Sequence, residues 1–229
     1  MNRNDFTLLT VTFNNDYLTL CMLNSFVKSN GYIPKTLIID NGTMQFTRIK
    51  PSNEISIFDN TCQHITGQYG QCSKNHCSTI DYALKNLVNS KYVILVDNDI
   101  LFKPKVKEYL DSFDMNKFDC AGEIGWDDAP PIRLFPYFCL INSEKFRNEK
   151  LNYFDNDRCI GPGSKEDGKR GTGTPCWYKD TGCSFLEDIQ ERWTIDKLKL
   201  DDFIVHLKCT GKSNYNYREF LMDNKELWS

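Results

Sequence analysis

Short runs of apolar and β-branched residues alternate with helix-like periodicities along the first hundred residues. The runs predict strands at residues 6–13, 36–39, 55–58 and 91–96, of which 6–13 and 91–96 are expected to be buried. Apolar positions at helical spacing predict helices at 17–27 and from about 75 to 88. This order predicts an α/β protein with a mostly parallel central sheet flanked by helices. Ligands of such sheets bind at the carboxyl ends of the strands.

The pattern is less regular after residue 102. It predicts helices at 105–113 and 183–193, and strands at 118–121, 137–141, 197–200 and 203–207. Residues 161–174 hold five glycines and predict a flexible surface loop, of a length that is often functional inside a compact domain. The 229 residues are enough for one sizeable core, so a single domain is expected.

Charge and composition narrow the class of protein. The 28 basic and 31 acidic residues give a net charge of −3, which excludes a strongly basic protein that coats nucleic acid. The sequence shows no apolar run of bilayer length and no secretory signal, so a cytoplasmic location with reduced thiols is expected for its ten cysteines. Cys21, Cys120, Cys139 and Cys183 lie in apolar patterns typical of buried small side chains.

One cysteine-rich stretch raises the question of zinc. It contains Cys62, His64, Cys72, His76 and Cys77, but no C-x-x-C pair occurs in the chain. Tetrahedral zinc sites usually begin from such a pair, so structural zinc is the less favoured hypothesis.

The main chemical signal is LVDNDILF, residues 95–102. A buried strand here presents Asp97 and Asp99 at its carboxyl end. Two carboxylates at this edge are suited to a divalent cation that carries substrate phosphates, although an Asp-rich turn alone would give the same letters.

Four segments in this order resemble the nucleotide-sugar-binding half of GT-A glycosyltransferases, most closely family two and its relatives. They are TVTFNN (10–15), IIDNGT (38–43), GQCSKNHCSTIDYAL (70–84) and YVILVDNDILF (92–102). The resemblance implies a GT-A (Rossmann-like) fold, with residues 1–102 binding the donor and residues 103–229 binding the acceptor.

The resemblance also implies roles for single residues in the donor half. Asp97 would reach the ribose side or the metal, and Asp99 would ligate the metal, in what the family knows as the D-x-D motif. The other donor-binding residues would be Thr12, Asn14, Asp40 and Asn75. Purely structural roles are open alternatives for several of these residues, because Asn14 and Asn75 could cap helices and Asp40 could belong to a turn.

Three residues of the second half complete the implied site. His206, in the strand 203–207, resembles the C-terminal histidine that completes the metal shell, and Lys212 resembles the nearby cation that meets the phosphates. Imidazole beside carboxylates favours Mn²⁺ over Mg²⁺. Asp180, before the helix 183–193, resembles the general base of inverting members, although it could be only an N-cap. Asp127 and Asp128 form a second candidate pair.

The resemblance therefore predicts a metal-dependent hexosyl- or pentosyltransferase. It would move a sugar from a nucleotide-diphosphate donor to a hydroxyl of a glycan or of another acceptor, a modified DNA base included, and Asp180 would make the reaction inverting. The alternatives are a nucleotidyltransferase and a non-catalytic or zinc-stabilised binding module. A nucleotidyltransferase would be expected to carry a Gly-rich basic loop after the first strand, where this chain has Asn14, Asn15 and Asp16.

Overall fold

The computed structural model describes residues 5–42, 47–60, 71–127, 129–153, 182–207 and 217–229, with the backbone alone for 71–75 and for the described part of 126–132. A seven-stranded sheet forms its centre, in the order β10-β6-β9-β4-β1-β2-β3. The strands are β1 (Phe6–Thr12), β2 (Lys35–Asp40), β3 (Ile55–Asp59), β4 (Tyr92–Asp97), β6 (Cys120–Gly122), β9 (Phe138–Asn142) and β10 (Ile195–Lys197). Only β9 runs antiparallel to its neighbours, so the predicted mixed, mostly parallel sheet is confirmed.

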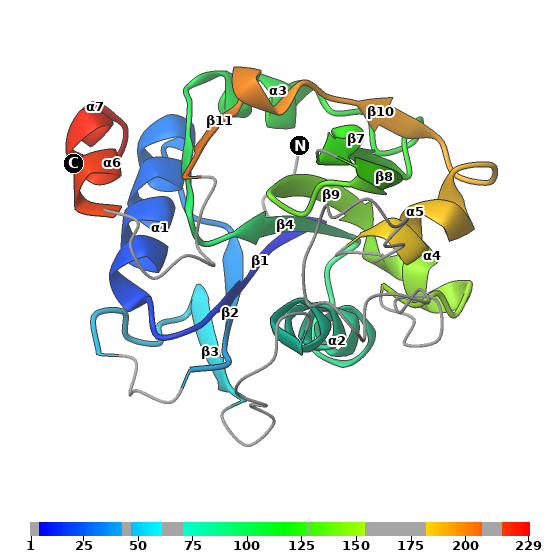
Figure 1. Cartoon of the computed structure of the whole chain (residues 1–229), viewed down its shortest axis with the longest axis horizontal. Coiled ribbons are helices and arrows are strands. Elements are labelled where there is room, and N and C mark those ends of the chain that lie inside the picture. Colours follow the sequence, from blue (N-terminus) through cyan, green and yellow to red (C-terminus); the bar gives the residue numbers. More distant parts are fainter. Residues whose placement is uncertain (1–4, 43–46, 61–70, 128, 154–181, 208–216) are drawn as a thin grey trace.

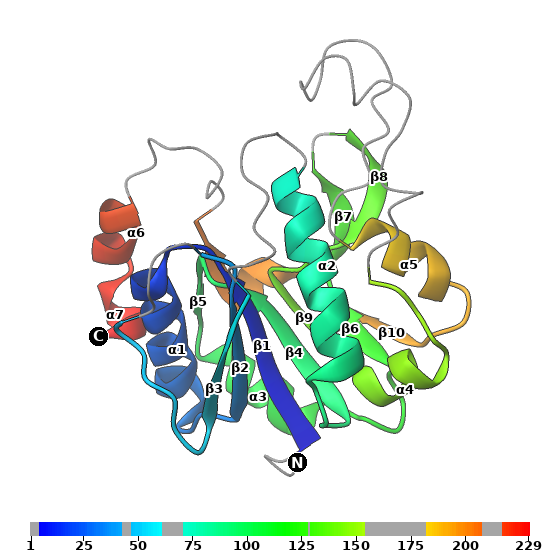
Figure 2. The ribbon, with the colours of Figure 1, turned by 90° about the horizontal axis from the view of Figure 1, so that it is seen from below.

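Helices cover both faces of this sheet (Figure 1). Helices α1 (Asp16–Asn30) and α3 (Lys105–Ser112) pack on one face, and α2 (Gln71–Asn86), α4 (Ser143–Asn148) and α5 (Cys183–Ile189) pack on the other. Helix α1 ends at Gly31, whose φ of 77° gives the left-handed cap that favours glycine. Figure 2 shows the carboxyl ends of β1, β2 and β4 at one edge, above the start of the chain.

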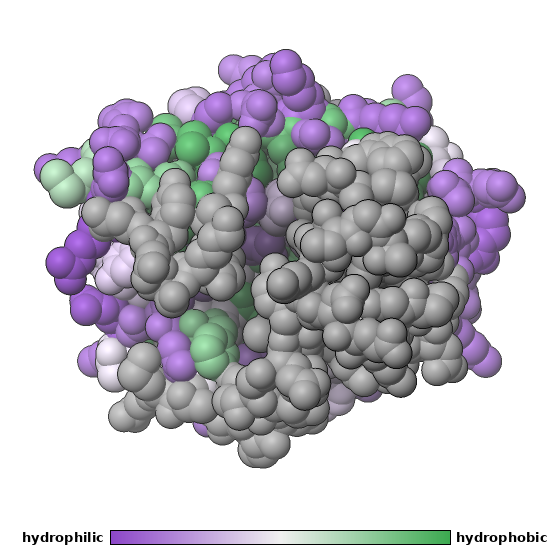
Figure 3. Space-filling view, in the orientation of Figure 1, coloured by the Kyte–Doolittle hydropathy of each residue, from purple (hydrophilic) through white to green (hydrophobic). Residues whose placement is uncertain are grey.

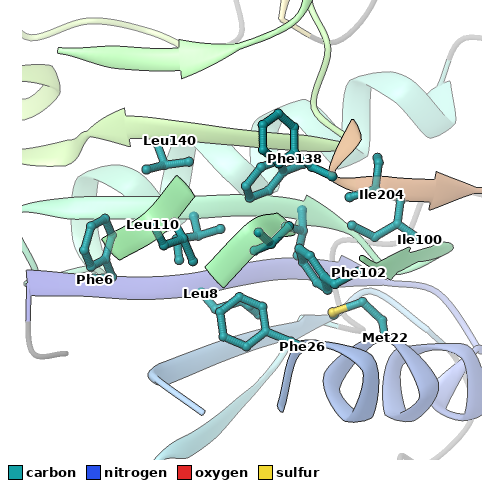
Figure 4. Packing of buried hydrophobic residues seen from close by; sticks show 14 of the residues in the cluster. Phe6, Leu8, Met22, Phe26, Ile100, Phe102, Leu110, Phe138, Leu140 and Ile204 are labelled. Carbon is teal, nitrogen blue, oxygen red and sulfur yellow. The ribbon is translucent and has the colours of Figure 1, made fainter. Parts of the chain in front are cut away.

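Alternate residues of the central strands feed two hydrophobic clusters. Phe6 and Leu8 of β1 pack with Met22 and Phe26 of α1, and Figure 4 shows Phe102 and Phe138 joining this cluster. The intervening residues of β1 pack with α2 and α5 on the opposite face. Strand β4 is buried on both faces, which explains its almost unbroken apolar sequence.

Two small sheets extend the central layer. Strand β5 (Ile100–Phe102) pairs antiparallel with β11 (Ile204–His206), and β7 (Ile124–Asp127) pairs antiparallel with β8 (Ala129–Leu134). A 3₁₀ turn, η3 (Leu200–Asp202), precedes β11. The chain closes with α6 (Tyr217–Asp223) and α7 (Lys225–Trp228), and Lys28 of α1 donates a hydrogen bond to the Ser229 carbonyl.

Three of the predicted elements have clearly different bounds in the structure. The predicted strand 197–200 is wrong, because the strand is β10 at Ile195–Lys197 and Leu200 opens the 3₁₀ turn. Helix α5 ends at Ile189 rather than 193, and the Arg192 amide then bonds the Ile189 carbonyl three residues back, as in a turn. Helix α2 begins at Gln71, so Asn75 lies inside it and is not its N-cap. The glycine-rich segment 161–174 lies outside the described residues.

Two further findings concern the burial of the cysteines and the length of the helices. Cys21, Cys120 and Cys139 are buried thiols, and burial raises the pKa of Cys21 to about 11. Among the helices that the structure describes, none is both long and apolar enough to cross a membrane.

Thr10 carries an internal cost that a substitution should remove. Its side chain is fully buried in β1, and its hydroxyl has no hydrogen-bond partner. Thr10→Val keeps the shape and removes the unsatisfied hydroxyl, so we expect the free energy of unfolding to rise by about 1 kcal/mol. Denaturant titration measures the change.

Thr36 is the matched control for this measurement. It is also buried, at 2% exposed, but its hydroxyl donates a hydrogen bond to the Pro34 carbonyl at 3.0 Å. Thr36→Val should therefore lower the free energy of unfolding by about 1 kcal/mol. Equal destabilisation by both substitutions would contradict the interpretation of Thr10.

Candidate functional site

The register of the strands brings several of the predicted site residues to the carboxyl edge of the sheet. Thr12 of β1 lies beside Asp40 of β2, and the preceding Val11 lies beside Asp97 of β4. Figure 3 looks onto this edge and shows hydrophilic residues set back near its centre. The register therefore brings Thr12, Asp40 and Asp97 to the same edge of the sheet.

Asn98 ties the turn after β4 to the first strand and helix. Its side-chain amide donates to the Thr12 hydroxyl at 2.9 Å and to the Thr19 hydroxyl of α1 at 3.3 Å. Asn98 therefore points into the protein. The carboxylates of Asp97 and Asp99, on either side of it in the sequence, face groups from two other elements. Thr12 is 1% exposed, and its hydroxyl already takes part in these hydrogen bonds. Its predicted contact with a nucleotide stays a prediction.

Asp97, Asp99 and His206 form one cluster. Each offers a ligand atom, and these atoms lie within 4.8 Å of one another. His206 Nε2 lies 3.3 Å from Asp99 Oδ2, and the Asp99 side chain is only 4% exposed. Pairing of β11 with β5 produces this approach, because it sets His206 opposite Ile100 and lets the Leu207 amide donate to the Asp99 carbonyl.

An aromatic side chain, Tyr137, packs against the His206 imidazole, and a cationic side chain, Arg133, packs against Tyr137. The Tyr137 ring packs on the imidazole with 3.9 Å between ring centroids. Arg133 of β8 is 5% exposed, lies over Phe135 and Tyr137, and donates to the Tyr137 hydroxyl at 3.1 Å. The sequence analysis missed Arg133 and Tyr137, because nothing in the run APPIRLFPY marks a residue that turns toward the site.

Asp97 is surrounded by charge in a buried place. Burial raises its pKa most, and the neighbouring Asp99 acts in the same direction. His76, His206 and Arg133 oppose this rise, yet the pKa stays above the ordinary value of 3.8. A cation bound here would favour the ionised form of Asp97, which burial disfavours.

The cluster fits a divalent transition metal. Two carboxylates and one imidazole are ligands that suit Mn²⁺, and Asp97 Oδ1 is buried with no hydrogen-bond partner. In the part of the chain that the structure describes, this is the one group of three or more such side chains that could hold an ion.

The ends of β1 and β2 meet beside this cluster. Asn14 has a left-handed φ of 50°, and a Cβ on Gly42 would lie 2.5 Å from its side-chain oxygen. The Gly42 amide donates to Asp40 Oδ1 at 2.8 Å. Only glycine fits at position 42, and the structure brings Asn14 and Asp40 together as the donor-binding hypothesis requires.

Asp40 predicts a pH effect on stability. Burial raises its pKa, with Asp59 and Asp16 adding to the rise, and the Gly42 bond only partly opposes it. A carboxyl whose folded pKa is raised contributes stability below the unfolded pKa, and this contribution is lost as the pH climbs through the folded pKa. Asp40→Asn should therefore be more stable than wild type at neutral pH, with no advantage at about pH 3.5.

Thermal unfolding across this pH range measures the difference. Asp202→Asn is the control of opposite sign, because hydrogen bonding to Lys105 lowers the pKa of Asp202. A stability gain at neutral pH in both variants, or in neither, would contradict the assignment to Asp40.

The remaining predicted residues are placed only in part. Asn75 lies in α2, but its side chain is outside the described residues, as are Asp180, Lys212 and Asp128. Of the cysteine-rich stretch, Cys77 is buried and His76 faces Asp97. The sequence analysis considered His76 only as part of the cysteine-rich stretch, whereas the structure shows that both His76 and His206 approach the acidic turn.

Comparison with solved structures decides the fold. The chain is similar to the mannosyltransferase PcManGT from Pyrobaculum calidifontis, solved with GDP-Man and Mn²⁺, at a TM-score of 0.55 and 11% identity over 94% of this chain and 59% of that chain. The chain has a GT-A fold. The Asp97, Asp99 and His206 cluster lies at the carboxyl edge of the sheet, the edge at which open α/β sheets in general bind ligands.

Two other glycosyltransferases are more distant. The galactosyltransferase LgtC, in complex with donor and acceptor sugar analogues, gives a TM-score of 0.45 and 14% identity, covering 62% of this chain and 59% of that chain. GlyE of Streptococcus pneumoniae gives 0.49 and 10%, covering 86% and 46%. This chain thus spans about half to three fifths of the length of these solved proteins. No protein-family model and no curated protein matches the chain.

Proposed function

We propose that this GT-A chain is a metal-dependent glycosyltransferase that moves a sugar from a nucleotide-diphosphate donor to an acceptor hydroxyl. The convergence of Asp97, Asp99 and His206 at the carboxyl edge of the sheet carries the proposal. The residues come from two distant parts of the chain, the turn after β4 and strand β11, and an acidic turn alone would not need the histidine.

The chain's own residues would hold the donor diphosphate in two ways. Asp97, Asp99 and His206 would bind Mn²⁺ or Mg²⁺, and Lys212 would meet the phosphates. The bound cation would supply Lewis-acid stabilisation of the departing diphosphate. Arg133 is buried, and its positive charge lies close enough to Asp97 to lower the pKa of that carboxyl. Asn14 and Asp40 would line the nucleotide.

On the acceptor side, Asp180 would act as the general base. It would take the proton of the acceptor hydroxyl while the oxygen forms its bond to the anomeric carbon. The bond from that carbon to the diphosphate oxygen breaks, and the nucleoside diphosphate leaves with the electron pair. Attack on the face opposite the leaving group inverts the anomeric configuration.

A hydrolysis screen tests the proposal without knowledge of the acceptor. The protein with Mn²⁺ is incubated with UDP- and GDP-linked sugars, and the release of nucleoside diphosphate is measured. Slow release from one donor, lost when EDTA replaces Mn²⁺, is expected. No release, together with pyrophosphate formation from a nucleoside triphosphate and a sugar phosphate, would identify a nucleotidyltransferase instead.

Thermal unfolding separates the non-enzymatic alternatives. Ligands that bind only the folded state raise the melting temperature. We expect Mn²⁺ together with UDP or GDP to raise it, and a rise with Zn²⁺ alone would indicate the zinc-stabilised module.

A further inference from the structure

The imidazole of His206 is packed against a ring from a distant part of the chain. Tyr137 lies in the turn before β9, and its ring centroid is 3.9 Å from that of the imidazole, with 30° between the ring planes. At this separation the faces of the two rings are in van der Waals contact. The nitrogen Nε2 of the same imidazole lies 3.3 Å from Asp99 Oδ2. The contact with Tyr137 therefore acts on a side chain that approaches the acidic turn.

Tyr137 is itself held by two residues at alternate positions of the segment before it. The Phe135 ring stacks on the Tyr137 ring, with 5.4 Å between centroids and 15° between planes. Arg133 lies over both rings and donates a hydrogen bond to the Tyr137 hydroxyl at 3.1 Å. Arg133 and Phe135 are 5% and 7% exposed, so their packing leaves little room for rearrangement. Tyr137 is therefore a fixed surface against which another ring can be oriented.

Strand β11 alone gives His206 limited support. The strand has three residues, His206 is the last of them, and within the described part of the chain its sheet has one other strand, β5. An isolated two-stranded pair of this kind is only marginally stable. Pairing of the backbone places the Cα of His206 but does not fix the rotation of its side chain. A flat ring against one face of the imidazole restricts that rotation.

We propose that Tyr137 is a positioning residue of the metal site. Its ring, held by Phe135 and Arg133, keeps the His206 imidazole turned toward Asp99, so that a nitrogen of His206 can ligate a divalent cation. This inference rests on the metal-binding part of the proposed function. Partners that orient a metal ligand contribute about 10- to 100-fold to metal affinity. Core packing alone would make Tyr137 matter for stability and not for which atoms ligate the cation.

The test uses the whole protein with Mn²⁺ alone, without nucleotide. Titration followed by electron paramagnetic resonance gives the Mn²⁺ affinity, and pulsed electron paramagnetic resonance detects the coupling of bound Mn²⁺ to a ligating imidazole nitrogen. The wild-type protein should show this nitrogen coupling. Tyr137→Leu should lose most of the coupling and bind Mn²⁺ about 10- to 100-fold more weakly.

Two more substitutions at the same position separate the ring from the rest of the side chain. Tyr137→Phe keeps the ring and removes only the hydroxyl to which Arg133 donates, so it should keep the nitrogen coupling and most of the Mn²⁺ affinity. Tyr137→Met fills the space with a flexible chain and no flat ring, so it should behave as the leucine variant does. The methionine variant also supplies the measurement if the leucine variant does not fold.

Tyr32→Leu is the matched control. Tyr32 is also a half-buried tyrosine in contact with another ring, since it meets Phe26 edge-on with 6.4 Å between centroids, but it lies just before β2. Its replacement should lower the melting temperature and leave the Mn²⁺ affinity and the nitrogen coupling as in wild type.

The outcomes separate this inference from the proposed function. If the wild-type protein binds no Mn²⁺, the proposed function is overturned and the inference with it. If it binds Mn²⁺ without nitrogen coupling, His206 is not a ligand, and only the inference is overturned. Wild-type coupling in Tyr137→Leu and Tyr137→Met would also overturn only the inference. An equal loss of coupling in Tyr32→Leu would do the same, because the effect would then follow from lower stability and not from the position of the ring.

Discussion

Asp99→Ala is expected to abolish Mn²⁺ binding and turnover together. Asp99 is the most deeply buried carboxylate of the cluster, and its oxygen lies 3.3 Å from His206 Nε2. Alanine removes one of the three ligand groups and leaves only Asp97 and His206. Loss of an outer-shell partner alone weakens metal binding about 10- to 100-fold, so loss of a direct ligand should exceed about 100-fold.

Titration of Mn²⁺ followed by electron paramagnetic resonance measures this loss, and nucleoside diphosphate release from the donor measures turnover. Asp201→Ala is the control, because Asp201 is an exposed acid in the 3₁₀ turn just before β11. Its Mn²⁺ affinity should equal that of wild type. If Asp99→Ala binds Mn²⁺ with wild-type affinity while its melting temperature shows a folded protein, the metal site lies elsewhere.

The parts of the fold that the sequence predicted well are those with a long, uniform local signal. Strand β4 reads as an apolar run because both of its faces are covered, and α1 shows both helical spacing and a glycine at its end. Strand β5 is different. It has three residues directly after the acidic turn, and its partner β11 lies about a hundred residues further along the chain, so no local period announces the pair.

Short elements after residue 102 show the same limit. Helix α4 has six residues, although Asn142 does cap it by accepting from the Lys145 amide, a signal that the sequence analysis passed over. The β7 and β8 pair carries two prolines and an irregular register, which hides its alternation. These elements depend on contacts with distant residues rather than on their own sequence.

The candidate site divides in a similar way. The position of Asp97 and Asp99 follows from a strand that ends where it does, and His206 could be selected because few histidines compete. Arg133, Tyr137 and His76 approach the site only through the packing of β8, of the segment before β9, and of α2 against the central strands. The position of such a side chain depends on how two elements pack across each other. The spacing of residues within one element therefore does not predict it.

Asp180→Asn is expected to lower turnover about 10²- to 10⁴-fold while leaving Mn²⁺ and donor binding unchanged. Asparagine keeps the size of the side chain and its capacity to accept a hydrogen bond, but it cannot take a proton from the acceptor. Because the base acts on the acceptor and not on the diphosphate, the loss should fall on kcat and not on the donor Kd. Nucleoside diphosphate release at saturating donor measures kcat, and calorimetry measures Kd.

Glu187→Gln provides the matched control, since Glu187 is an exposed carboxylate on α5, a few residues further along. Its turnover should stay within about twofold of wild type, as for surface positions away from a site. Full turnover in Asp180→Asn, combined with loss in Asp127→Asn, would move the base to β7. In that case the effect of Asp99→Ala would still stand, because the leaving-group side and the acceptor side of the reaction use different residues.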